Sequence, residues 1–284
     1  MGDIKASIQT GLFHRFVKPS AEWTALLDEA RKNEEALAAR YPTEDQQLRA
    51  ACRIIAGEAP PLRSLLESAG DPEAFCASCL TLRGPFEEGP LRRQARELSR
   101  LLGYLSAGAP IPDSAQAVLD LWETANRLEP RWYDDQPAHF RTSADHVPFS
   151  RTGFSFEDGP VPRGMETAAP EEIPELVSLL LTWLRARELP PELTAFTAHH
   201  LFVKIHPFPD GNGHTARLLC CGLLSRVYAA PTLTVFLREI AQSRALIYES
   251  ILNDGARDGD MCPACCDLIR LLIRGQERLL GGDL

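Results

Sequence analysis

Residues 206–217 read HPFPDGNGHTAR and lie between two apolar segments, residues 201–205 and residues 218–224. Pro207 cannot continue a helix and disfavours the α conformation at the residue before it. The first apolar segment is therefore predicted to end a helix near Ile205, and the second to lie inside a buried helix. This order of helix, tight loop and helix places every polar group of interest in the loop.

The loop has the features of an anion site. Gly211 and Gly213 allow positive φ angles and let a ligand approach the backbone closely. The next helix is predicted to begin between Gly213 and Thr215, and its first amide N–H groups have no partner within the helix. Those groups form the positive end of the helix dipole, and such glycine-rich turns commonly bind phosphate.

Three side chains of the stretch suit group transfer from a phosphate donor. Asp210 is a hard carboxylate of the kind that binds Mg²⁺ between phosphates. Arg217 lies about one turn into the helix, where its guanidinium can bind a phosphate oxygen. His206 titrates near neutrality and can remove the proton of an attacking hydroxyl. Together they predict a phosphoryl- or nucleotidyl-transfer site.

The stretch resembles the signature of the Fic family, HPFx(D/E)GNGRxxR, and differs from it at one specified position. The resemblance implies an all-α fold, with a Fic-like helical core and a small β-hairpin flap, over about residues 91–275. It also implies a protein adenylyltransferase, which transfers AMP from ATP, with Mg²⁺, to a Ser, Thr or Tyr hydroxyl of a target protein.

The same resemblance assigns roles to the matching residues. His206 is the expected catalytic base, and Asp210 is the expected ligand of a Mg²⁺ ion between the α- and β-phosphates. Arg217 is expected to hold the terminal phosphate, Phe208 to anchor the loop in the core, and Asn212 to bind phosphate through its backbone and its side-chain amide. The expected donor-binding residues are Phe208, Gly211, Asn212, Gly213, His214 and Arg217.

His214 stands where the Fic family usually has arginine. A neutral imidazole binds phosphate less well than a guanidinium, and its charge depends on pH. Another donor (a different nucleotide, phosphocholine or phosphate) therefore stays open, as does a decayed module that binds nucleotide or protein without turnover. A nucleophilic or metal-binding role for His214 is a further alternative. A transition-metal hydrolase would instead use His200, His206, Asp210 and His214.

The composition is ordinary for a soluble globular protein of 284 residues, with a net charge of -9 and a pI of about 5.3. The acidic balance argues against nucleic-acid binding, which needs a basic face. The sequence has no long apolar run and no recognisable signal peptide, so we expect a cytoplasmic protein that does not bind membranes. Its eight cysteines include two CxxC-type pairs, which we interpret as buried thiols, with structural zinc as the alternative.

The chain is predicted to form a helical N-terminal extension, residues 1–89, and a catalytic core, residues 90–284, with a Gly- and Pro-rich loop between them. On the helix that leads into the motif, His199 and His200 are expected to be packing residues with satisfied hydrogen bonds. Helices or helical segments are expected over residues 20–41, 43–56, 62–66, 71–80, 91–105, 113–128, 170–184, 193–204, 232–237, 238–252 and 263–280.

Residues 140–154 are turn-rich and partly alternating, which predicts a hairpin or an extended loop. In Fic proteins the flap at this place pairs with the backbone of the target, so the target is expected to dock near residues 140–154. Self-modification and oligomer formation stay open. Many Fic proteins also carry an inhibitory glutamate; Glu58 and Glu88 are the candidates here, although neither follows a Ser or Thr at the family's spacing.

Overall fold

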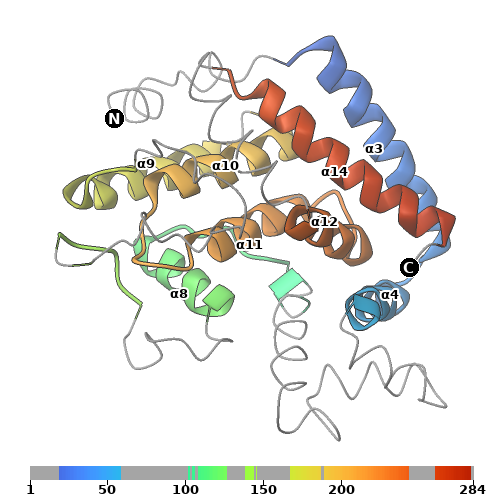
Figure 1. Cartoon of the computed structure of the whole chain (residues 1–284), viewed down its shortest axis with the longest axis horizontal. Coiled ribbons are helices and arrows are strands. Elements are labelled where there is room, and N and C mark those ends of the chain that lie inside the picture. Colours follow the sequence, from blue (N-terminus) through green and yellow to red (C-terminus); the bar gives the residue numbers. More distant parts are fainter. Residues whose placement is uncertain are drawn as a thin grey trace, which may run out of the picture.

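The computed structural model describes residues 19–58, 102, 104–105, 108–126, 138–143, 145, 167–186, 189–242 and 260–282. Within these ranges every regular element is a helix, which confirms the all-α prediction (Figure 1). The elements are α3 (Ala21–Arg40), α4 (Glu44–Glu58), α8 (Ala115–Asn126), the 3₁₀ helix η3 (Pro170–Glu172), α9 (Ile173–Ala186), α10 (Pro191–Ile205), α11 (Asn212–Leu224), α12 (Ala230–Gln242) and α14 (Cys262–Gly281). Most of the expected flap lies outside the described residues.

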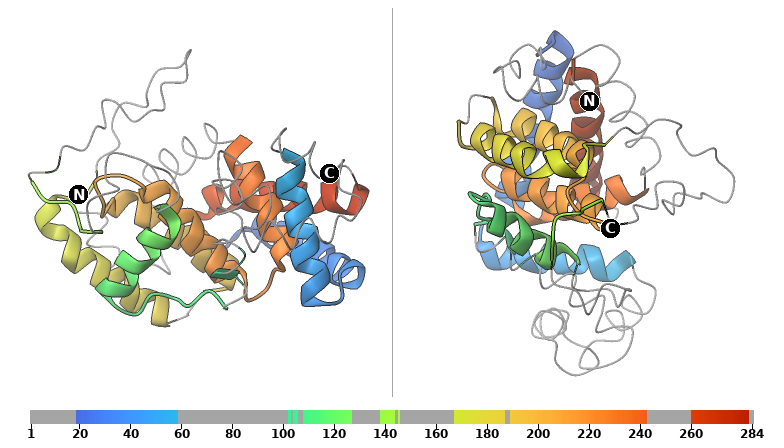
Figure 2. Two further views of the ribbon diagram at one scale, coloured as in Figure 1. Left: turned by 90° about the horizontal axis from the view of Figure 1, so that it is seen from below. Right: turned by 90° about the vertical axis from the view of Figure 1, so that its left-hand side faces the viewer.

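The central helix of the described part is α10. Every residue from Glu192 to Ile205 is buried, and α10 packs against α9, α11 and α14 (Figures 1 and 2). A helix that is covered on all sides must place its polar residues inside the protein as well. Pro191 lies in its first turn, where a missing N–H costs nothing, and Pro207 follows its end.

The first helix of the described residues, α3, runs beside the last, α14 (Figures 1 and 2). Ser20 caps α3, since its hydroxyl oxygen accepts a hydrogen bond from the Trp23 amide at 3.1 Å. Trp23 then packs edge-on against Phe196 of α10, with ring centroids 6.3 Å apart. Although α3 belongs to the predicted N-terminal extension, it therefore shares one hydrophobic core with the helix that leads into the motif.

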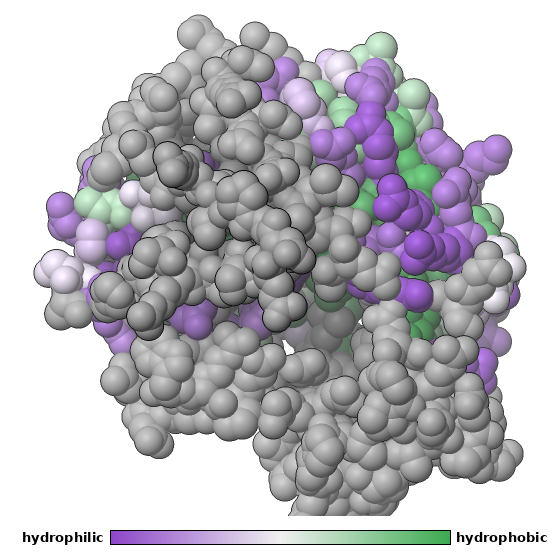
Figure 3. Space-filling model, viewed as in Figure 1, coloured by the Kyte–Doolittle hydropathy of each residue, from purple (hydrophilic) through white to green (hydrophobic). Residues whose placement is uncertain are grey.

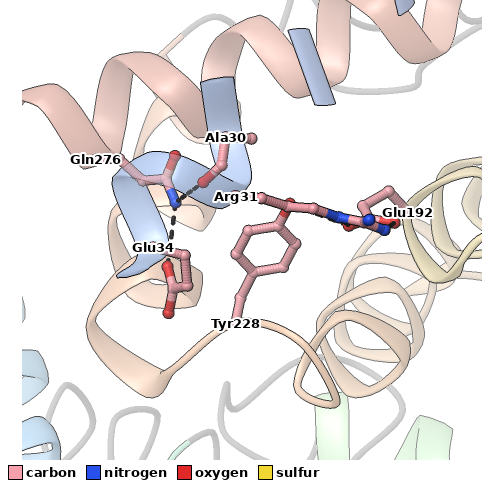
Figure 4. A network of polar contacts seen from close by, with 6 residues as sticks. All are labelled: Ala30, Arg31, Glu34, Glu192, Tyr228 and Gln276. Carbon is pink, nitrogen blue, oxygen red and sulfur yellow. Dashed lines mark hydrogen bonds and ion pairs between the residues drawn. The ribbon is translucent and has the colours of Figure 1, made fainter. Parts of the chain in front are cut away.

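An ion pair between a half-exposed arginine and a buried glutamate joins α3 to the start of α10 (Figure 4). Arg31 donates two hydrogen bonds of 3.3 Å to the carboxylate of Glu192, which is fully buried. The hydroxyl of Tyr228 donates a third hydrogen bond, of 3.2 Å, to the same carboxylate. A buried carboxylate is tolerated only when it is paired and hydrogen-bonded in this way.

Glu34, one turn farther along α3, caps α12 from across the fold. Its carboxylate accepts hydrogen bonds of 2.6 Å from both the Ala229 amide and the Thr232 hydroxyl, just where α12 begins. Gln276 of α14 donates to Glu34 at 3.1 Å and to the Ala30 carbonyl at 3.0 Å (Figure 4). Burial raises the pKa of Glu34, although these hydrogen bonds act in the opposite direction.

One sequence prediction about the helices was wrong. The segment 232–237 and the first part of the predicted helix 238–252 form a single helix, α12. Pro231 allows this because it lies in the first turn of α12, where a helix tolerates proline. Residues 243–252, the Gly- and Pro-rich loop between extension and core, and the helical segments expected over residues 62–80 lie outside the described residues.

The described cysteines are buried, free thiols: Cys220, Cys221, Cys262, Cys265 and Cys266. Burial raises the pKa of Cys221 to about 12, so this thiol stays protonated at neutral pH. On the face shown in Figure 3, hydrophilic residues cover much of the described surface, and apolar residues show between them. Among the helices of the described ranges, none is both long enough and apolar enough to cross a membrane.

Candidate active site

The loop between α10 and α11 is anchored in the core by one aromatic ring. Phe208 is fully buried. Its ring contacts Trp122 of α8 at 5.5 Å between centroids, Phe140 at 5.6 Å and Phe202 of α10 at 6.2 Å. Rings from three separate segments therefore fix the depth of the loop beneath the surface.

Asn212 closes the loop on itself. Its side-chain nitrogen donates to the Phe208 carbonyl at 2.8 Å, and its side-chain oxygen accepts from the Phe208 amide at 2.9 Å. The sequence reading gave this side-chain amide to a phosphate. In the structure the side chain is buried and holds the backbone of the loop, so of the two groups expected to bind phosphate only the backbone N–H is not used in these bonds.

Gly211 forms the bend at which α11 begins. It has φ +79°, and a β-carbon built on it would lie 2.4 Å from the side-chain oxygen of Asn126 on α8. Only glycine satisfies both the left-handed backbone and this close approach. The amide nitrogen of Asn126 donates to the Gly211 carbonyl at 3.4 Å and to the Thr215 hydroxyl at 3.1 Å, which ties α8 to the bend.

The N-terminus of α11 has amide groups without partners inside the helix. The helix begins at Asn212, one residue earlier than the earliest start predicted, and its N-cap is Gly211, which has no side chain to cap it. The first N–H with a partner inside the helix belongs to Thr215, which donates to the Gly211 carbonyl at 3.0 Å. The amides of Asn212, Gly213 and His214 precede it and form the positive end of the helix dipole.

Asp210 is held at both its backbone and its side chain. Its carbonyl accepts a hydrogen bond of 2.8 Å from the indole N–H of Trp122. One carboxylate oxygen accepts a hydrogen bond of 2.6 Å from the Gly211 amide. The described residues contain no group of three or more His, Cys, Asp and Glu side chains that could hold a metal ion. A single oriented carboxylate still fits Mg²⁺, which is often bound by one or two carboxylates together with substrate phosphates and water.

His206 ends α10 in an unusual conformation. Its φ of 52° and ψ of 59° are left-handed, and its N–H donates to the Phe202 carbonyl at 2.9 Å. Burial lowers the pKa of His206 to about 4, and the positive charge of Arg141 adds to this effect. A hydrogen bond with the backbone of Val203 and the charge of Asp210 act in the opposite direction. The imidazole is therefore unprotonated at neutral pH.

His214, the departure from the family signature, points its Nδ1 atom toward Asn126 of α8, at 3.2 Å from the side-chain oxygen. The amide nitrogen of Asn126 lies among three acceptors, the Trp122 carbonyl, the Gly211 carbonyl and the Thr215 hydroxyl. That arrangement fixes which end of the amide faces His214. Because the facing atom is an oxygen, the neutral His214 ring carries its proton on Nδ1.

Arg217 of α11 is partly buried, and its charge influences a histidine of α10. The charge of Arg217 reaches His199 of α10, and burial together with this charge lowers the pKa of His199 to about 3. His199 and His200 are buried, as packing residues should be. The prediction of satisfied hydrogen bonds was wrong for His199, since neither of its ring nitrogens has a partner in the part of the chain that the structure describes. His199 lies on a helix that is buried from Glu192 to Ile205, so water does not reach its ring.

The structure does not gather His200, His206, Asp210 and His214 into one group, so the transition-metal hydrolase reading fails on its geometry. The candidate inhibitory residue Glu58 is the last residue of α4, which packs against α12. Its side chain, like all of Glu88, lies outside the described residues.

Three residues that hold the loop were missed as site residues in the sequence. Trp122 and Asn126 lie one turn apart on α8, and Arg141 lies at the start of the segment that was expected to form the flap. A buried asparagine one turn after a tryptophan, on an otherwise apolar helix face, was the available signal for the first two. Arg141 follows Phe140 in a turn-rich segment, and nothing local to it indicates that its partner is residue 206.

Comparison with known proteins agrees with this geometry. The profile of the Fic/DOC family matches residues 138–224, which include Arg141, α10, the loop and α11. The chain is 36% identical over 119 residues to a protein adenylyltransferase Fic of Nematostella vectensis, which covers 41% of this chain and 25% of that protein. It is 35% identical over 89 residues to a protein adenylyltransferase Fic of Culex quinquefasciatus, covering 30% and 17%. The matches thus span a quarter or less of these relatives.

Solved structures share the fold. A crystal structure of a Fic family protein from Desulfovibrio desulfuricans G20 matches with a TM-score of 0.61 at 18% identity, over 94% of this chain and 76% of that one. Fic-1 from C. elegans matches with a TM-score of 0.51 at 19% identity, over 91% and 71%. The motif and the match over residues 138–224 identify a Fic/DOC domain in this chain, and the solved structures share its helical fold.

Proposed function

We propose that this protein is a protein adenylyltransferase that transfers AMP from ATP to a Ser, Thr or Tyr hydroxyl of a target protein. One observation carries the proposal. An unprotonated imidazole, His206, lies in the same anchored loop as the bare N-terminus of α11 and the oriented carboxylate of Asp210. The names of the relatives from Nematostella vectensis and Culex quinquefasciatus support the same chemistry.

His206 acts as the base in this reaction. The hydroxyl oxygen of the target forms a bond to the α-phosphorus of ATP, the bond between the α-phosphorus and the bridging oxygen to the β-phosphate breaks, and pyrophosphate leaves. The hydroxyl proton passes to the imidazole, which is neutral at pH 7 because burial and Arg141 keep its pKa low. A correctly placed base of this kind contributes about 10²–10⁴-fold to the rate.

The donor phosphates bind at the first turn of α11. The amides of Asn212, Gly213 and His214 point out of the helix end, and the left-handed Gly211 lets the phosphates approach the backbone. Arg217 adds a positive charge farther along α11. A Mg²⁺ ion held by Asp210 would neutralise negative charge on the phosphates as the α–β bond breaks.

The experiment uses the full chain with Mg²⁺, a cell lysate and ATP labelled on its α-phosphate. We expect labelled protein, and an adduct mass equal to one AMP. The His206→Ala variant should lose most of this labelling. Arg40→Gln, which alters the last residue of α3, a donor to carbonyls at the C-terminal end of α14, should keep it. Labelling that persists unchanged in His206→Ala would overturn the assignment of the base.

A second candidate keeps the site and changes the donor. The observation that favours it concerns residue 214, where the family signature has an arginine and this chain has a histidine. The hydrogen bond between His214 and Asn126 turns this side chain toward α8. A donor with fewer phosphates, such as a nucleoside diphosphate derivative or a phosphocholine donor, depends less on this position. The adduct mass obtained with each donor separates these reactions from AMP transfer.

A further inference from the structure

Arg141 is the point at which three separate segments of the site are joined. Its guanidinium is buried. Its Nε atom donates to the carbonyl of His206 at 2.6 Å, and its Nη2 atom donates to the carbonyl of Ala168 and to the hydroxyl of Thr167, the latter at 3.4 Å. Its backbone N–H donates to the carbonyl of Pro207 at 2.8 Å. One residue therefore holds two successive carbonyls of the loop.

The conformation of His206 needs such support. Its left-handed backbone brings the β-carbon close to the carbonyl oxygen, which L-residues other than glycine, asparagine and aspartate rarely accept. A residue keeps such a conformation only when its surroundings fix it. The N–H of His206 is bound to Phe202, and Arg141 binds its carbonyl. These two bonds set the direction in which the imidazole leaves the backbone.

The positive charge of arginine and the several N–H donors of its planar guanidinium explain why arginine suits position 141. A planar guanidinium can donate to the His206 and Ala168 carbonyls at once, whereas an ammonium cannot match that geometry. Burial lowers the pKa of Arg141, although the charges of Asp145 and Glu171 act in the opposite direction. Burying a cation is costly, so a neutral side chain would serve better if the role were only to fill space.

We infer that Arg141 is a positioning residue that holds the catalytic base His206 in its working orientation. The inference rests on the proposed role of His206 as base. The positive charge of Arg141 has a second effect, because it disfavours the imidazolium and keeps the base unprotonated.

The kinetic test compares Arg141→Gln and Arg141→Lys with the Arg40→Gln control, which also removes an arginine that binds main-chain carbonyls. We expect Arg141→Gln to lower kcat by about 10²-fold, as misplacement of a reacting group by 1 Å can do, and to change the KM for ATP little. Arg141→Lys, which keeps the charge, should lose less. In a His206→Ala background, Arg141→Gln should cause no further loss, since it acts through the imidazole.

An NMR titration tests the same inference without any transfer of AMP. The ring nitrogens of His206, assigned by comparison with His206→Ala, are followed by NMR as a function of pH in the protein without nucleotide. We expect the pKa of His206 to rise in Arg141→Gln and to stay low in Arg40→Gln. Failure of the wild type to transfer AMP would count against the proposed function alone, because this titration tests the placement of Arg141 independently.

The kinetic test and the NMR titration can each overturn the inference. Folded Arg141→Gln with an unchanged kcat and an unchanged His206 resonance would do so. A raised KM for ATP at an unchanged kcat would also do so, because it would make Arg141 a donor-binding residue. If Arg141→Gln does not fold, kcat, KM and the His206 pKa are measured in Arg141→Lys instead. A kcat of Arg141→Lys equal to that of the wild type would show that the planar guanidinium is not needed to hold His206.

Discussion

The indole N–H of Trp122 donates a 2.8 Å hydrogen bond to the carbonyl of Asp210, across 88 residues of sequence. The same indole contacts the ring of Phe208 at 5.5 Å. One side chain of α8 therefore sets both the depth of the loop and the orientation of the residue proposed to hold Mg²⁺. The loop of the motif is correctly shaped only when α8 is packed beside it.

Replacing Trp122 with phenylalanine separates the ring contact with Phe208 from the hydrogen bond to the Asp210 carbonyl. The smaller ring keeps an aromatic contact with Phe208, but the carbonyl of Asp210 loses its donor. We expect a loss of about 1–3 kcal/mol in the free energy of unfolding, measured by urea denaturation. Transfer activity should fall further than stability explains, with a higher Mg²⁺ requirement. Tyr228→Phe, which removes a buried hydroxyl from the distant Glu192 network, should lose stability and keep that Mg²⁺ requirement.

Gly211 and Gly282 form a matched pair for testing the bend. Both have φ +79°, but a β-carbon on Gly211 would meet Asn126 at 2.4 Å, whereas one on Gly282 would meet nothing within 4 Å. Gly282→Ala should therefore cost about 1–2 kcal/mol at most, the price of a left-handed alanine. Gly211→Ala should cost clearly more and abolish transfer. Equal thermal stability of the two variants would contradict the close approach of α8.

His214→Arg restores the residue that the family signature has at this position. The new guanidinium gains a charge-assisted bond to a donor phosphate, and the hydrogen bond to Asn126 is lost. We expect ATP to bind about tenfold more tightly, the effect of roughly 1.4 kcal/mol, as measured by calorimetry. An unchanged affinity would show that residue 214 does not face the donor and would favour the alternative donors. Asn126→Asp is tested beside His214→Arg, because the aspartate still offers an oxygen that accepts the hydrogen bond from His214.

Nucleotide binding should raise the pKa of His206. In the protein without nucleotide this pKa lies at about 4, below the ordinary value of 6.5, because burial and Arg141 disfavour the charged ring. Phosphates bound at α11 add negative charge near the ring, which favours the charged form. The acid limb of kcat, which reports the bound state, should therefore lie at higher pH than the acid limb of kcat/KM. Coincident limbs would place the donor away from His206.

Glu34 links the stability of the whole core to pH. Its pKa is raised in the folded protein above the ordinary value of 4.5, chiefly by burial. The stabilising contribution of this carboxyl is therefore complete below about pH 4.5 and is lost as pH rises through the folded-state pKa. Glu34→Gln should remove that part of the pH dependence of unfolding while lowering stability, because one acceptor of the α12 cap is lost. An unchanged pH profile would show that Glu34 is ionised without penalty.

Glu34→Gln also tests whether the predicted extension is separable from the core. Through Glu34, Arg31 and Trp23, α3 contacts helices that carry or flank the motif. We expect unfolding of this variant to remain a single transition when followed both by far-ultraviolet circular dichroism and by tryptophan fluorescence. Two separate transitions would indicate that α3 and the motif helices unfold independently.

The sequence by itself determined the local features of the site. Pro207 ends α10 and Gly211 bends the chain before α11, because each depends on backbone preferences within a few residues. These preferences are carried by the residue types themselves, which is why the loop, its flanking helices and the family could all be predicted.

Only the tertiary structure decided what holds that loop in place. Arg141 reaches His206 across 65 residues, Asn126 reaches Gly211 across 85, and Glu34 reaches Ala229 across 195. Such pairs depend on how whole helices pack, so the sequence around one residue of a pair does not indicate which residue is its partner. The enclosure of α10 on every side is a property of the same packing, and it explains why the ring nitrogens of His199 lack partners among the described residues.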